Sequence, residues 1–504
     1  MLLDGNTGWH IRTGDFILDH RQIPYRDLFS FSKPGQPWFA WEWGADVIFA
    51  ALVRLGGLKA LVLFSGSLIA FYVVIILRWS VAIGANALIA LALTLLAMGA
   101  STVHYLARPH LFTLVLLPLC LYILERGRHL WVLVPLTLLW TNLHGGFAAF
   151  LACFGLWLLG HRSVRPAFWF LLCSLATLVN PYGFHLHQHI LEYLRSDWIR
   201  DVVVEFRSPS FRTENIFQYE VLLVLGLMAT ASCLSRRRYT HALWILFWAH
   251  QSLSSARHIT IYAAIAVPII AVELTAAWNR YIESRPATSV AAILNSLAGD
   301  LTPQFRRLSL WAVAAVAAFG LIPQQWPHDF PKFRFPVAAA DRFGAKIQSS
   351  RLLTMDQWAD YLIYRFHPSV KVFFDGRSDF YGQKVGDDYI RVAAGHASWR
   401  SILDRYGFDL ALLPPDWALA SLLKLDPSWS LLSEDSTALL FARIPSTEPA
   451  TSIDNPTVNL MKIPSSAEFS KRDPFAMEPC VNSSRPSPEA GSRLAAVRLR
   501  PDHD

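Results

Sequence analysis

Long uninterrupted blocks of apolar residues constrain this chain most. LVLFSGSLIAFYVVIIL (61–77) and ALIALALTLLAMGA (87–100) contain no charged residue. Each approaches the roughly 20 apolar residues with which a helix crosses a bilayer. Such blocks recur, and 53% of all residues are hydrophobic against 16% that are charged, unlike an ordinary soluble domain. The sequence therefore predicts a polytopic membrane protein.

About ten such segments predict a mainly α fold, with a transmembrane helix bundle over residues 47–323. We expect spans at 47–77, 81–100, 110–124, 130–144, 146–160, 166–180, 219–234, 242–256, 258–277 and 309–323. Their connections alternate between an arginine-rich set and a set that is nearly bare, with Arg108 and Arg257 as exceptions. The arginine-rich set contains Arg78, Arg126, Arg128, Arg162, Arg165, Arg236, Arg237, Arg238, Arg280, Arg285, Arg306 and Arg307.

Basic connections tend to stay in the cytoplasm. By alternation we expect residues 1–46 to form a first outer loop, and the bare turns, the loop 181–218 and everything after 323 to face outward as well. Within the loop 181–218, apolar residues recur every four positions and predict one amphipathic helix. This stripe consists of Leu186, Ile190, Leu194, Trp198 and Val202. The helix either lies in the membrane interface or packs against the spans.

After Pro323 the pattern changes to short strands and helices. We predict strands at 351–355 and 370–374, helices at 357–366 and 398–406, and further strands in LALLPP, WSLLSED and TALLFARI. This alternation indicates a soluble α/β domain with a mixed sheet at 324–445. Residues 446–504 are rich in Ser, Pro, Glu, Asn and Arg, and we expect a disordered tail there.

The positive charge does not indicate a nucleic-acid partner. The net charge is +7, but the basic residues separate apolar blocks and form no single patch. Four of the five cysteines lie inside apolar runs, so neither a disulfide framework nor a cysteine metal site is expected. Membrane lipids are the partners that this composition favours.

Polar residues recur in four outward turns, HYLARPH, TNLHGG, NPYG and SSARHI. Ionisable groups near span ends are costly unless they face a cavity, a partner or the lipid head groups. Because bundled helices bring such turns together, we expect a shared cationic outer cavity that suits a lipid phosphate. The alternative is that each side chain snorkels or caps a helix end. The candidate binding residues are Arg108, His110, Asn142, His144, Asn180, Arg257 and His258.

The first stretch of the chain places acids among aromatic residues on the same outward side. DGNTGWHIRTGDFILDHRQIPYRDLFSFSKPGQPWFAWEW (4–43) contains the candidate catalytic acids Asp4 and Glu42 and the candidate binding residue His10. A carboxylate at a membrane surface can take a proton from an acceptor hydroxyl or help to hold a divalent cation. Alternatively, the stretch is a solvated loop whose aromatic residues form an interfacial belt.

A later motif, FFDGRSDFY, follows a predicted strand and contains Asp375, Arg377 and Tyr381. Loops after strands in α/β domains often bind ligands. Two interpretations stay open. Asp375 and Arg377 form an ordinary ion pair at a turn, or the loop closes over the outer cavity and helps to recognise an acceptor.

Taken together, these motifs resemble a bacterial family of large membrane proteins in the GT-C superfamily of polyprenyl-phosphate-sugar-dependent glycosyltransferases. The resemblance rests on the opening stretch, ARPH, NLHGG, NPYG and FFDGRSDFY, and covers about residues 4–445. It implies a multi-pass protein of the bacterial inner membrane that transfers a sugar from a polyprenyl-phosphate-linked donor to a glycan or lipid acceptor. It also implies an extracytoplasmic C-terminal domain and, by position, that Asp4 is the acid required for transfer.

Two departures from the GT-C pattern matter. Similar sequences tend to have a second acid where this chain has Asn6, whose oxygen can ligate a cation but whose carboxamide cannot act as a base. No cofactor is certain, and a divalent cation, Mg²⁺ or Mn²⁺, is the one candidate. The span expected before the acid is also missing, and we expect the chain to begin late, with about 20 apolar residues preceding Asp4.

Two other function classes fit the same residues. A transporter or flippase of lipid-linked glycans would share the cationic cavity, but it needs polar residues through mid-span, which 61–77 and 87–100 scarcely offer. A non-catalytic membrane protein with a ligand-binding outer domain would tolerate replacement of the arginines and histidines in the outer turns.

Overall fold

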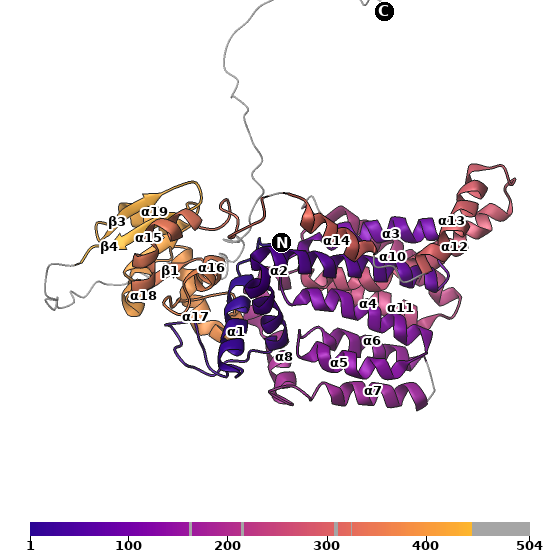
Figure 1. Ribbon diagram of the computed structural model, residues 1–504, viewed down its shortest axis with the longest axis horizontal. Helices are drawn as coiled ribbons and strands as arrows, with labels where there is room; N and C mark the ends of the chain where they lie inside the picture. Colours follow the sequence, from indigo (N-terminus) through magenta and orange to yellow (C-terminus); the bar gives the residue numbers. More distant parts are fainter. Residues whose placement is uncertain (161–163, 213–215, 307–310, 324, 446–504) are drawn as a thin grey trace, which may run out of the picture. The chain divides into compact units, whose positions relative to one another are not determined.

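The computed structural model describes residues 1–160, 164–212, 216–306, 311–323 and 325–445. The predicted tail at 446–504 lies outside this part of the chain, as do Arg162 and Arg307 of the basic connections. The described residues form a helical bundle and a smaller domain with one four-stranded sheet (Figure 1).

Each of the ten predicted spans coincides with a helix. These helices are α2 (Trp43–Ala82), α3 (Ala87–Ala100), α4 (His110–Arg126), α5 (Leu133–Thr141), α6 (Phe147–Leu159), α7 (Val164–Ala176), α10 (Phe217–Ser235), α11 (Tyr239–Ser254), α12 (Ile259–Glu283) and α14 (Trp311–Leu321). Short 3₁₀ turns lie at Thr102–His104 (η1), Leu130–Val132 (η2), Val204–Phe206 (η3) and Ala256–His258 (η5), and α13 (Val290–Arg306) follows α12.

By length and composition, three segments of the described chain can cross a membrane on their own: Trp43–Ala82, Phe217–Ser235 and Ala256–Glu283. The other helices at predicted spans have 17 residues or fewer. The helices of the bundle are therefore confirmed, whereas ten membrane crossings are not. Within α2 the backbone leaves the helical region at Gly56 and Gly57, and the φ of +66° at Gly57 is one that glycine adopts readily.

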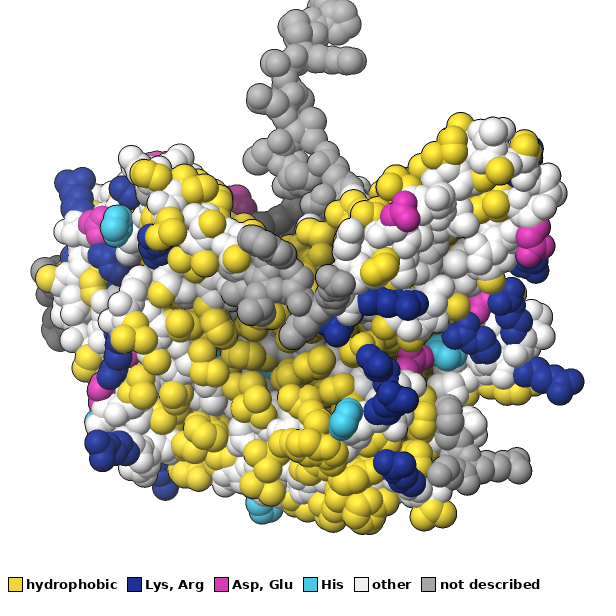
Figure 2. Space-filling model, turned by 45° about the vertical axis from the view of Figure 1, so that its right-hand side comes forward, with side chains coloured by type: hydrophobic (Ala, Val, Ile, Leu, Met, Phe, Trp, Pro, Cys, Tyr) yellow, Lys and Arg dark blue, Asp and Glu magenta, His cyan; other side chains and the backbone are white. Residues whose placement is uncertain are grey.

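The bundle presents apolar side chains on its outside. In α7 the exposed residues Val164, Phe168, Leu171 and Leu175 recur every three or four positions, which makes one continuous stripe along the helix. Figure 2 shows a broad field of hydrophobic side chains on one face of the molecule, with Lys and Arg side chains mainly toward its left and right sides. Exposed apolar surface on this scale is typical of a surface that contacts lipid.

The first outer loop predicted at 1–46 begins with a buried helix, α1 (Thr7–His20), which packs between α2 and α16 (Asp356–Phe366). Glycines permit this close packing. A Cβ at Gly8 would lie 2.2 Å from the carbonyl oxygen of Asp360, and one at Gly14 would lie 1.9 Å from that of Asp46. Much of the opening stretch is thus part of the core and not a solvated loop.

The single amphipathic helix predicted in the loop 181–218 is wrong. The segment forms two helices, α8 (His185–Arg195) and α9 (Asp197–Val202), separated at Ser196. Ser196 has an extended backbone, and its side chain caps α9 by accepting a hydrogen bond from the backbone N–H of Ile199. The predicted stripe is also not uniformly buried within α8, because Leu186 and Ile190 are buried, whereas Leu194 is exposed.

The α/β domain has a mixed sheet, as predicted, and the structure gives its strand order as β1-β2-β4-β3. Strands β1 and β2 are parallel, and the other neighbours are antiparallel. Its elements are α15 (Val337–Ser349), β1 (Leu352–Thr354), α16 (Asp356–Phe366), α17 (Ser378–Ala393), α18 (Trp399–Tyr406), β2 (Leu410–Leu413), α19 (Ala418–Leu425), β3 (Trp429–Glu434) and β4 (Leu439–Arg443).

The strand predicted at 370–374 is not a strand of this sheet. Its central residue, Val372, makes only isolated bridges, to Ser30 and to Leu352. Val372 donates to the carbonyl of Phe29 and accepts from the N–H of Phe31, both at 2.9 Å. The loop between α1 and α2 therefore satisfies backbone groups that a neighbouring strand would otherwise pair.

Candidate functional site

One candidate site forms around Asp4, which is only 6% exposed. Its Oδ2 accepts a hydrogen bond from Nη1 of Arg108 at 3.0 Å, and its Oδ1 accepts one from the backbone N–H of Asn6 at 2.9 Å. The same Nη1 of Arg108 lies 2.6 Å from Oε1 of Glu205. The start of the chain, the turn before α4 and the loop 181–218 thus meet at one guanidinium.

The α/β domain reaches this site through α16. In the orientation that satisfies both of its ends, the Asn6 carboxamide donates to Asp360 at 2.6 Å and accepts from Nη2 of Arg108 at 3.3 Å. Asp360 also accepts from the backbone N–H of Gly376 at 3.1 Å. A Cβ at position 376 would come within 1.7 Å of the Asn6 side chain, so the glycine of the DGR motif is required by close packing.

A second acid, Glu42, lies between two histidines at the start of α2. Its carboxylate is 3.6 Å from Nε2 of His10 and 3.5 Å from Nε2 of His144. The backbone N–H of Gly146 donates to Nδ1 of His144, which places that ring's proton on Nε2, toward Glu42. Nδ1 of His10 lies 2.6 Å from Asp46. Three of the predicted residues, His10, Glu42 and His144, therefore form one cluster.

Burial sets the protonation of this cluster. Desolvation raises the pKa of Glu42 to about 7, although the charges of Arg108 and Arg257 partly oppose the shift. Desolvation, together with Arg257 and Arg108, lowers the pKa of His144 to about 3, and desolvation lowers the pKa of His10 well below its usual range. At neutral pH both imidazoles are uncharged, whereas the pKa of Glu42 lies close to neutral pH.

The positive charge of Arg257 acts on two acids, Glu42 and Glu205, and lowers the pKa of each. Its guanidinium lies 4.5 Å from the ring centre of Phe206, next to Glu205 in the sequence. Burial raises the pKa of Glu205, but Arg108 and Arg257 lower it more, so the net shift is downward. His110 donates from Nε2 to the carbonyl of His104 at 2.6 Å. Glu42 is thus a largely buried acid of adjustable charge within electrostatic range of two cations. Such an arrangement can accept a proton and stabilise an anion.

Three predicted binding residues stabilise turns or neighbouring helices. Asn142 accepts from the indole of Trp43 and donates to the carbonyl of Val179, both at 2.9 Å. Asn180 donates to carbonyls within its own turn. Nδ1 of His258 lies 3.2 Å from the carbonyl of Gln251. In these contacts the side chains of Asn142, Asn180 and His258 bind other groups of the protein.

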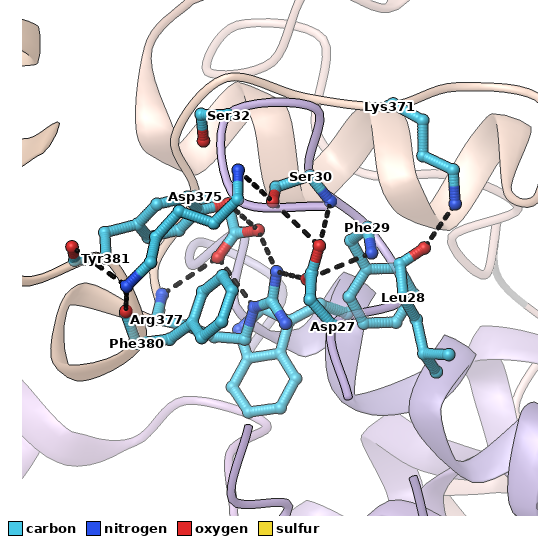
Figure 3. A network of polar contacts seen from close by, with 12 residues as sticks. Asp27, Leu28, Phe29, Ser30, Ser32, Lys371, Asp375, Arg377, Phe380 and Tyr381 are labelled. Carbon is cyan, nitrogen blue, oxygen red and sulfur yellow. Dashed lines mark hydrogen bonds and ion pairs between the residues drawn. The ribbon is translucent and has the colours of Figure 1, made fainter. Parts of the chain in front are cut away.

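The DGR motif forms a closed network with the N-terminal segment (Figure 3). Arg377 donates to both oxygens of Asp375, at 2.9 and 2.7 Å, and to Asp27 at 2.9 Å, while Tyr381 donates to Asp375 at 2.7 Å. Asp375 and Arg377 are at most 2% exposed. The geometry favours the ion-pair interpretation, because this network fastens the loop between α1 and α2 to the α/β domain and leaves no exposed face for an acceptor.

Sequence reasoning missed several members of these clusters. Glu205 stands alone in VVVEF, and an isolated acid in an apolar run was a signal that could have been used. His189 pairs with Asp379 at 3.0 Å and stacks on Phe39. Asp360 lies on α16. Nothing in the sequence around it indicated its contact with Asn6. These pairings join residues 97 or more positions apart.

The residues around Asp4 do not fit a divalent cation as they are arranged. In the described part of the chain, no group of three or more His, Cys, Asp or Glu side chains could hold a metal ion. Asp4 and Glu205 instead share one guanidinium nitrogen, and Asn6 faces the other.

No protein-family model and no curated protein matches this sequence. Among solved structures, the fold is similar to the archaeal oligosaccharyltransferase AglB from Archaeoglobus fulgidus, determined in complex with an inhibitory peptide and a dolichol-phosphate. The TM-score is 0.51, with 11% identity over 88% of this chain and 70% of that chain. At this identity the likeness concerns the fold alone.

Proposed function

We propose that this chain is an integral membrane glycosyltransferase of the GT-C type. It moves a sugar from a polyprenyl-phosphate donor to a lipid-linked or cell-surface acceptor on the extracytoplasmic face of the bacterial inner membrane, with about ten helices in the bilayer. The observation that carries the proposal is the largely buried acid Glu42, which lies between His10 and His144 at the start of an apolar helix, within electrostatic range of Arg108 and Arg257. The fold similarity to an oligosaccharyltransferase solved with a dolichol-phosphate supports it.

In the proposed reaction the oxygen of an acceptor hydroxyl attacks C1 of the sugar. The bond between C1 and the phosphate oxygen breaks, its electron pair leaves with the phosphate, and the hydroxyl proton passes to the carboxylate of Glu42. Arg257 stabilises the departing phosphate, and the Nε2–H of His144 orients Glu42. We assign the base to Glu42 and not to Asp4, because both oxygens of Asp4 already accept hydrogen bonds, from Arg108 and from Asn6.

The test uses the full chain, purified in lipid, with a panel of polyprenyl-phosphate sugars and glycan acceptors. We expect the parent to transfer sugar. In Glu42→Gln we expect kcat to fall at least about 100-fold, in line with loss of a general base. Glu192→Gln, which changes an exposed acid on α8, is the matched control. Because the base is the ionised carboxylate and the pKa of Glu42 is about 7, the parent's rate should rise with pH, be half-maximal near pH 7 and level off about one unit above it.

Two results would contradict this proposal. The first is an unaltered rate and pH profile in a folded Glu42→Gln variant. The second is no product from any donor, which is the behaviour expected of a flippase or a non-catalytic binding protein.

A further inference from the structure

Three oxygen atoms converge on the guanidinium of Arg108. Asp4 Oδ2 lies 3.0 Å and Glu205 Oε1 2.6 Å from Nη1, and the Asn6 carboxamide oxygen lies 3.3 Å from Nη2. These atoms come from the start of the chain and from η3. Carboxylate and carboxamide oxygens are the ligands that Mg²⁺ and Mn²⁺ prefer. The set of donors therefore suits a hard cation, yet its centre is occupied by an arginine.

The backbone holds Arg108 in this position. The preceding residue, Ala107, donates to the carbonyl of Met1 at 3.1 Å and accepts from the hydroxyl of Thr7 at 2.9 Å. The carbonyl of Glu205 accepts from the hydroxyl of Ser255 at 3.0 Å. The turn that bears the guanidinium and the segment that bears Glu205 are thus both tied to their surroundings.

Charge keeps the guanidinium ionised there. Burial alone would lower the pKa of Arg108, but Glu205, Asp4 and Glu42 raise it more strongly, and the net shift is upward. A divalent cation placed among the same oxygens would lie roughly 2 Å from each of them. That position is within contact of the guanidinium, so the two cations would repel each other and compete for the same two negative charges.

We propose that the guanidinium of Arg108 takes the place of a divalent cation in this site. Arg108 neutralises Asp4 and Glu205 and sets their separation, which are the tasks a metal ion would otherwise perform. It follows that sugar transfer requires no divalent cation, a consequence that rests on the proposed function.

The direct test is the binding of Mn²⁺ to the full-length protein, measured by electron paramagnetic resonance and calorimetry. We expect no site for Mn²⁺ in the parent and a new site in Arg108→Ala, with a Kd on the order of 0.1–1 mM, the weak end of oxygen-ligand sites. The double variant Asp4→Asn with Arg108→Ala removes one ligand and should bind at least tenfold more weakly. Arg257→Ala, which removes an arginine that contacts Phe206 instead, should create no site.

Mn²⁺ binding by the parent that disappears in Asp4→Asn would overturn the inference, as would a folded Arg108→Ala variant that binds no Mn²⁺. If Arg108→Ala does not fold, the parent and Asp4→Asn still decide the question. A separate arm measures transfer with excess EDTA. Unchanged transfer supports the inference, and a loss that Mn²⁺ restores contradicts it. Absence of transfer under every condition contradicts the proposed function and leaves the Mn²⁺ result standing.

Discussion

Glu42, His10 and His144 illustrate how surroundings, more than residue type, determine which side chain changes its charge near neutral pH. An exposed histidine would titrate near pH 6.5 and an exposed glutamate near 4.3. In this cluster the pKa of the glutamate lies above those of the two histidines. Each group loses its hydration on burial, and the neighbouring arginines disfavour a positive charge on the histidines. The residue types were visible in the sequence, but their protonation follows from packing.

Arg377 permits a prediction about stability at the same scale. Replacing it in Arg377→Met leaves Asp27 and Asp375 buried without a cation, and we expect unfolding to become easier by about 3–5 kcal/mol. Arg400→Met is the matched control, because Arg400 pairs with Asp426 through a side chain that is 68% exposed. That change should cost less than about 1 kcal/mol. Thermal unfolding of the purified variants measures both, and equal shifts would argue against a structural role for the network.

Among the elements, apolar length predicted the helices of the bundle well, because a long apolar block in lipid has few other ways to satisfy its backbone. The loop 181–218 was harder. Its four-residue repeat is that of a continuous helix, but Ser196 ends one helix and caps the next. Val372 likewise has the neighbours of a strand, yet pairs with the distant loop residues Phe29 and Phe31.

The close packing of α1 on α16 gives an element-scale prediction. In Gly8→Ala the new methyl group meets the backbone of α16, 2.2 Å from the carbonyl oxygen of Asp360. We expect a loss of about 1–3 kcal/mol, as for other overpacked contacts, and a lower transfer rate because Asp4 moves with α1.

The control is Gly299→Ala on α13, where no atom lies within 4 Å of the added Cβ. This exposed helical position should gain about 0.5–1 kcal/mol. Melting temperatures in lipid compare the two variants. A Gly8→Ala protein as stable as the parent would mean that α1 and α16 are not packed as described.

At the scale of the whole molecule, the bundle and the α/β domain belong to one compact unit. The first stretch of the chain joins them: Gly5 and Asn6 contact α16, while Thr7 contacts the turn before α4. If the proposed topology is correct, this junction and the α/β domain lie outside, and the arginine-rich connections lie in the cytoplasm.

That topology can be tested by labelling intact cells with a membrane-impermeant maleimide. The four cysteines in the described chain are buried, so a Cys480→Ser background offers few competing thiols. Leu425→Cys, at a position 84% exposed on α19, should be labelled. Arg237→Cys, in the connection between α10 and α11, should be labelled only after the membrane is permeabilised. Labelling of Arg237→Cys in intact cells would reverse the proposed orientation.

The sequence by itself determined the apolar helices, the arginine-rich connections and the mixed α/β domain. These depend on local hydrophobicity and periodicity, which neighbouring residues express together. Only the tertiary structure decided that Asp4 faces Arg108 and Glu205, that Glu42 lies between two histidines, and that Arg377 is closed off by Asp27. Those contacts join segments up to about 350 residues apart, and no local pattern carries information about which distant charge a buried side chain will meet.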